Sequence, residues 1–143
     1  MNINELMINN CVFVNTEEDI FPARITNLTK SGIIEVSRYD TGEVIETTIE
    51  KCSPCPIPLR ILTNSLKFTK RSGISKNELI LILEIPDTKE FYSVILGDEV
   101  NGSRSIKICN SEFSEILTSS VKNVHQIQNF IKIVTNLEIH ISI

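Results

Sequence analysis

Tryptophan is absent from this 143-residue sequence, alanine occurs once, and there are only five glycines and five prolines. The glycines are scattered among turns, so no glycine-rich phosphate-binding loop is present. Apolar residues make up 41% of the chain, which excludes an intrinsically disordered protein. The 14 basic residues are outnumbered by 18 acidic ones and the net charge is −4. General binding to the nucleic-acid backbone, which requires a basic surface, is therefore disfavoured.

Long apolar runs are also missing. The opening MNINELMINN has no basic region followed by an apolar core, and no apolar run approaches the roughly 20 residues needed to span a bilayer. We therefore expect a cytoplasmic protein, either in the cell that produces it or in a host. The length predicts one domain over residues 1–143, with subregions 1–51, 52–66 and 67–143.

The first subregion has short alternating segments separated by turn residues. Alternation predicts strands over residues 6–14, 20–28, 33–39 and 43–49. Short, evenly spaced strands are typical of a strongly twisted, half-barrel-like antiparallel meander.

A proline-rich connector follows. Three prolines between residues 54 and 58 are expected to exclude regular ladder pairing. Residues 59–66 have apolar positions at helical spacing and predict a short helix.

The last subregion predicts a second antiparallel sheet covered by one helix, so the fold class is α+β. Residues 79–85 (LILILEI) are expected to form a central strand covered on both faces. Asn123 can cap a helix that runs to Thr135, and Asn136 can close it. Further strands are predicted over residues 90–96, 103–109 and 137–143, with an Asn101-Gly102 hairpin between the first two.

Three segments resemble a known group of proteins. These are residues 6–12 (LMINNCV), residues 56–59 (PIPL) and residues 124–129 (VHQIQN). In this order they resemble small uncharacterised proteins of Bacteroidetes phages and prophages over nearly the whole chain. The resemblance implies a phage or prophage source and a layout of elements, and it implies no activity.

Cys52 and Cys55 form a Cys-x-x-Cys pair, a spacing that can hold zinc or exchange a disulfide. A zinc site would have to recruit Cys11, Cys109 or a histidine from distant strands. The neighbouring prolines also argue against a redox motif that opens a helix. We therefore expect buried or semi-exposed thiols with no metal, disulfide or cofactor, and zinc at Cys52 and Cys55 is the weaker alternative.

His125, Gln128 and Asn129 fall on one side of the predicted helix. They could contact a ligand together, or they could hydrogen-bond strand ends and loop carbonyls where the helix packs on the sheet. The sequence leaves both interpretations open. His140 alternates with isoleucines and is expected to face solvent.

Other candidate contacts carry charge or lie beside it. A small anion could be bound by Arg38, Tyr39, Arg71 and Arg104, although a scatter of surface charges explains the same residues. Glu112 and Glu115 are expected on a solvated face. No setting for a nucleophile and its base is recognisable.

Together these features favour a non-enzymatic phage accessory protein without a cofactor. Its expected role is counter-defence, by sequestering a small anionic nucleotide-type signal of the host. A protein-interaction inhibitor of a host enzyme and an enzyme with an unrecognised site are alternatives. The abundance of isoleucine and of apolar strand edges predicts a symmetric homodimer.

Overall fold

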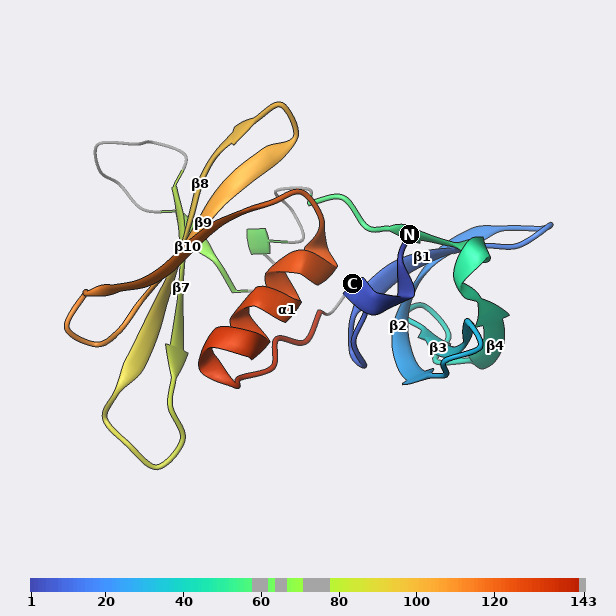
Figure 1. Ribbon diagram of the computed structural model, residues 1–143, viewed down its shortest axis with the longest axis horizontal. Helices are drawn as coiled ribbons and strands as arrows, with labels where there is room; N and C mark the ends of the chain where they lie inside the picture. The colour runs from blue at the N-terminus through green and yellow to red at the C-terminus, as the bar shows by residue number, and fades with distance from the viewer. Residues whose placement is uncertain (58–61, 64–66, 71–77, 142–143) are drawn as a thin grey trace.

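The computed structural model describes residues 1–57, 62–63, 67–70 and 78–141. In this part of the chain ten strands form two antiparallel sheets. One α-helix lies between the sheets (Figure 1). The protein is therefore α+β, as the sequence predicts.

The N-terminal sheet has the strand order β4-β3-β2-β1-β5. Phe21, Ala23 and Ile25 lie on the buried face of β2, which agrees with the alternation that predicted a strand over residues 20–28. A cation–π contact places Arg38 over the Phe21 ring at 3.8 Å. The strands are β1 (Cys11–Asn15), β2 (Ile20–Leu28), β3 (Ile33–Arg38), β4 (Val44–Thr48) and β5 (Cys52–Pro54).

The first strand begins later than predicted, because a turn occupies residues 7–10. A 3-10 helix, η1 (Ile3–Glu5), precedes this turn. The Asn10 side chain accepts a hydrogen bond of 2.8 Å from the Met7 N–H, and Asn9 has a positive φ of 73°. Asparagine tolerates this left-handed conformation, so the chain folds back before Cys11.

The prediction that the proline-rich connector forms no ladder is wrong for β5. Val12 pairs with Pro54 and Val14 pairs with Cys52 at the edge of the sheet. Proline lacks only the backbone donor, and an edge strand needs donors on one side alone. The short helix predicted over residues 59–66 lies outside the described residues, apart from 62–63.

The second sheet has the order β10-β9-β8-β7-β6. The predicted Asn101-Gly102 hairpin is confirmed, with φ of 52° and 74° at the two positions. The prediction that residues 79–85 are covered on both faces is wrong: Leu81 is buried, but Ile82 is 49% exposed. The strands are β6 (Thr69–Lys70), β7 (Leu79–Glu84), β8 (Phe91–Val100), β9 (Ser103–Cys109) and β10 (Glu115–Val121).

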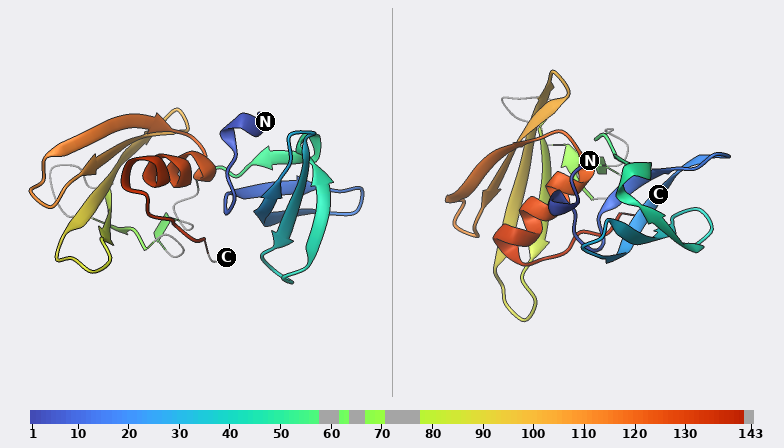
Figure 2. Two further views of the ribbon diagram at one scale, coloured as in Figure 1. Left: turned by 60° about the horizontal axis from the view of Figure 1, so that its bottom comes forward. Right: turned by 45° about the vertical axis from the view of Figure 1, so that its right-hand side comes forward.

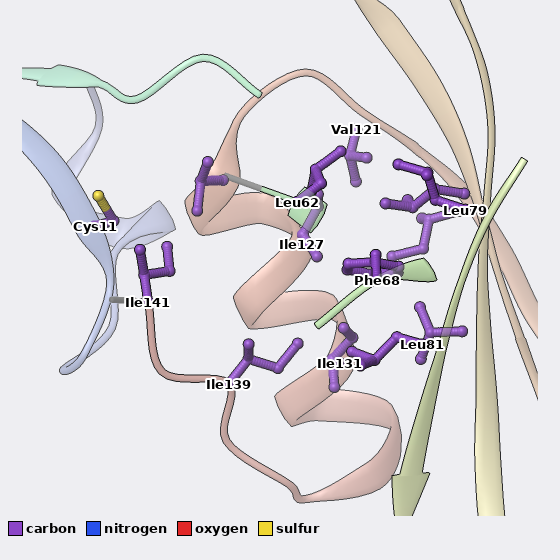
Figure 3. Close-up of a cluster of buried hydrophobic side chains, with 14 of the residues drawn as sticks. Cys11, Leu62, Phe68, Leu79, Leu81, Val121, Ile127, Ile131, Ile139 and Ile141 are labelled. Atoms are coloured by element: carbon purple, nitrogen blue, oxygen red, sulfur yellow. The ribbon is translucent and has the colours of Figure 1, made fainter. Parts of the chain in front are cut away.

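The helix α1 (Val124–Thr135) has the predicted ends. The Gln126 side chain accepts a hydrogen bond of 3.0 Å from the Asn123 N–H at its start. Asn136 adopts a left-handed φ of 58° and donates its N–H to the Lys132 carbonyl at 2.8 Å. Ile127 and Ile131 lie in the core between the helix and the second sheet (Figure 3).

Residues 137–141 are not the predicted final strand. They run back past α1 toward β1, and Figure 3 shows Ile139 and Ile141 between the helix and Cys11. Both isoleucines are buried while His140 is exposed, so the predicted alternation is correct although ladder pairing is absent. Ile139 and Ile141 belong to the core that links the two sheets, and Figure 2 shows the chain running from the end of α1 toward the N-terminal sheet. Among the described residues, no helix has the length and apolar character that a membrane crossing requires.

Candidate functional site

A groove of about 330 Å³ lies where β10, one side of α1 and the N-terminal segment meet. This volume is within the range of small-molecule pockets. Helical spacing explains one wall, because residues four apart lie on the same side of a helix. His125, Asn129 and Ile133 therefore line the groove together.

The groove has polar and apolar parts. Polar lining comes from Asn4 and Glu5 of η1 and from Ser119 and Ser120 on β10. Apolar lining comes from Met7, Phe130 and Ile133, and Ile133 is 71% exposed. The described lining residues include no lysine or arginine.

His125 is the unusual member of this set. The residue is 2% exposed, and neither ring nitrogen has a hydrogen-bond partner within the part of the chain that the structure describes. A buried polar group without a partner costs about 1–3 kcal/mol. Buried polar side chains normally have partners, so this imidazole needs an explanation.

Burial lowers the pKa of His125 below its ordinary value of 6.5, and the negative charge of Glu5 partly opposes the shift. The ring is therefore neutral at neutral pH, with one nitrogen as donor and the other as acceptor. Both nitrogens are covered by protein atoms, so a polar group in the groove would bond to one of them only after a small movement uncovers it.

Gln128 has a different role. Its Oε1 accepts a hydrogen bond from the Cys11 N–H at 3.0 Å, and its Nε2 donates to the Asn9 carbonyl at 3.0 Å and to the Ile139 carbonyl at 3.1 Å. These bonds tie α1 to the start of β1 and to the C-terminal segment. For Gln128 the structure supports the interpretation that the side chain satisfies strand and loop groups.

Asn129 combines both interpretations. Its Oδ1 accepts from Asn10 Nδ2 at 2.8 Å, and its Nδ2 donates to the Glu5 carbonyl at 2.6 Å. These bonds hold the N-terminal segment against α1. Asn129 also lines the groove that this segment closes.

The predicted anion contacts do not gather in this groove. Arg38 pairs with Asp40 at 2.8 Å and with Asp19 at 3.4 Å, and the hydrogen bond from Arg38 lowers the pKa of Asp40 to about 2. Tyr39 packs against the core, and Arg104 on β9 is buried and donates to the Gly97 carbonyl at 2.9 Å. Arg71 lies outside the described residues.

The four cysteines are free thiols and all are buried. Cys52 belongs to the core of the N-terminal sheet, whereas Cys55 lies in the core that contains Cys11 and α1. The two therefore do not present their sulfurs to one shared site. Burial raises the pKa of Cys52 to about 11. Among the described residues, no three His, Cys, Asp or Glu side chains are grouped so that they could hold a metal ion.

A second hollow of about 280 Å³ lies near the β7–β8 turn and is lined by Glu90, Tyr92 and Ser111 among others. Ser111 Oγ is already bonded to the backbone of Phe91, with distances of 2.8 Å and 3.0 Å. None of the described residues that line this hollow has a buried polar atom without a partner. The groove at His125 is therefore the better candidate site.

Comparisons with protein-family models, curated proteins and solved structures find no match to this chain. Support for the candidate site therefore comes from its geometry alone.

The sequence indicated His125 and Asn129 on the α1 wall of the groove. It did not predict the other two walls, which are β10 and the N-terminal segment. Residues 115–121 are exposed except Val121, so their sequence gives only a weak alternating signal for β10. Glu115 does lie on a solvated face, as predicted, where it pairs with Lys107 at 3.5 Å. The N-terminal wall forms through contacts between residues more than 100 positions apart, which no local pattern reveals.

Proposed function

We propose that the protein is a non-enzymatic binding protein and that the groove at His125 holds its ligand. The observation that carries this proposal is the buried, neutral imidazole of His125, which lines the groove with both ring nitrogens unpartnered among the described residues. A ligand that hydrogen-bonds this ring would remove the cost of burying it.

Binding is favoured over catalysis by what His125 does not contact. Ser119, Ser120 and Glu5 line the same groove, but within the described chain the imidazole bonds to none of them. A serine nucleophile requires a base in hydrogen-bond contact, and that base requires an orienting group. The groove contains these residue types, but within the described chain neither the hydrogen bond from a serine to His125 nor one from His125 to an orienting group is present.

The lining favours a nucleoside-type ligand. Phe130, Met7 and Ile133 offer an apolar surface for a planar ring, and His125, Asn4 and Ser119 offer donors and acceptors for its edge. The Glu5 carboxylate and the absence of lysine and arginine from the described lining disfavour a phosphate inside the groove. The anionic part of a nucleotide would then remain outside, in solvent.

This proposal keeps the nucleotide signal of the sequence-based prediction but assigns recognition to its base and sugar. The resemblance to phage proteins supports a role in sequestering such a molecule in the cytoplasm of an infected host. A sequestering protein needs affinity for its ligand and no catalytic group.

Thermal shifts with adenosine, guanosine, cytidine and uridine, each compared with its 5′-monophosphate, test the proposal. We expect at least one nucleoside to raise the melting temperature, and its monophosphate to do so no more strongly. The His125→Leu variant should lose this shift, whereas the matched His140→Leu control, which changes an exposed histidine outside the groove, should keep it. Absence of a shift with all four pairs, or an unchanged shift in His125→Leu, would contradict the proposal.

A further inference from the structure

Among the described residues, the strand β10 forms one edge of the second sheet and pairs with β9 alone. Six of its seven residues are exposed, and Ile116 and Leu117 are 46% and 45% exposed. Its one charged residue, Glu115, pairs with Lys107 of its own sheet at 3.5 Å. Such an edge presents free backbone donors and acceptors to another strand.

The other edges are protected from pairing. In β4, Glu46 lies at the centre of the strand and would face the same carboxylate in a second copy. β5 has three residues and ends in Pro54, and β6 has two residues. Among the described edges, β10 alone is long, free of proline and uncharged at its centre.

We propose that β10 pairs with β10 of a second copy, antiparallel across a two-fold axis at Thr118, so that the second sheets of two chains form one continuous sheet. With this axis Leu117 lies opposite the partner's Ser119, and Glu115 lies opposite the partner's Val121. No two like charges face each other. The same strand serves on both sides, as a closed two-fold interface requires.

The pairing bears directly on the groove, and this step rests on the proposed function. Ser119 and Ser120 line the groove, and across the two-fold axis they meet the partner's Leu117 and the partner's Ile116. Because neighbouring residues of a strand point to opposite faces, only the partner's Leu117, which shares the face of Ser119, would extend the apolar rim near Ile133. Each copy would therefore complete the site of the other, and ligand binding and pairing would strengthen one another.

Charge substitutions at Thr118 provide the test, because its side chain is exposed and lies at the proposed axis. Light scattering should give twice the 16.1 kDa mass of one chain for the unaltered protein. Thr118→Glu and Thr118→Lys should each halve that mass by placing like charges across the axis. Mixing the two variants in equal amounts should restore the full dimer mass, because opposite charges then face each other.

Val44→Glu is the matched control: it adds the same charge to an exposed position of the β4 edge and should leave the dimer intact. A monomeric mass for the unaltered protein, or Thr118 variants that remain dimeric, would overturn the proposal. So would a mixture that stays monomeric while circular dichroism shows both variants folded. No ligand is present in these measurements, so their failure is distinct from failure of the proposed function. A nucleoside shift that persists in monomeric Thr118→Glu would overturn only the shared groove.

Discussion

Replacing His125 with leucine should stabilise the unliganded protein, which is the opposite of what removal of a buried polar side chain usually does. His125 is 2% exposed, and both ring nitrogens lack partners within the described residues. Leucine removes the buried donor and acceptor and keeps apolar volume in the same place. We expect the free energy of unfolding to rise by about 1–3 kcal/mol, the cost of an unsatisfied buried polar group.

Gln128→Leu provides the contrast three positions along the same helix. This substitution removes the Gln128 amide and with it three hydrogen bonds, so the Cys11 N–H and the carbonyls of Asn9 and Ile139 lose this partner. At about 1 kcal/mol for each bond, the free energy of unfolding should fall by about 3 kcal/mol. The free energies of unfolding of the two variants should therefore differ from each other by about 4–6 kcal/mol, and the value of the unaltered protein should lie between them.

Urea denaturation monitored by circular dichroism measures both changes, and similar slopes would show that the unfolded states are comparable. A fall in the free energy of unfolding for His125→Leu close to that for Gln128→Leu would refute the reasoning. Such a fall would mean that the His125 side chain stabilises the folded protein, so it would not be an unsatisfied group that awaits a ligand.

Three further outcomes follow from the structure. Burial lowers the pKa of His125, so the unfolded chain takes up the proton before the folded chain does as the pH falls. The free energy of unfolding should therefore fall as the pH drops below about 6.5. This pH dependence should be weaker in His125→Leu than in His140→Leu. The four buried thiols should react with iodoacetamide only after unfolding, giving four adducts by mass spectrometry, and fewer would reveal a disulfide or a blocked sulfur. Asn136→Ala should cost about 1 kcal/mol at the left-handed helix end, whereas Asn136→Gly should cost less, as urea denaturation would show.

Local sequence signals predicted much of the fold. The helix ends at Asn123 and Asn136, the strand β2 and the Asn101-Gly102 hairpin were all predicted correctly, because each depends on residues close together in the chain. Alternation over residues 137–141 predicted burial correctly but not pairing. A period of two requires only an extended backbone against an apolar layer, and α1 and β1 supply that layer.

The candidate site was harder to predict, because its parts meet only in three dimensions. Helical spacing grouped His125, Gln128 and Asn129, but nothing local distinguished the tied Gln128 from the unpartnered His125. That distinction depends on where Cys11, Asn9 and Ile139 lie after folding.

The most direct test of the binding site is the nuclear magnetic resonance signal of the His125 ring during titration with the nucleoside that gives the largest thermal shift. A ligand bonded to the imidazole should move the nitrogen resonances of His125 and leave those of the exposed His140 unchanged. Resonances of His125 that stay fixed while the nucleoside binds would contradict the account, because the ligand would then occupy a different part of the molecule.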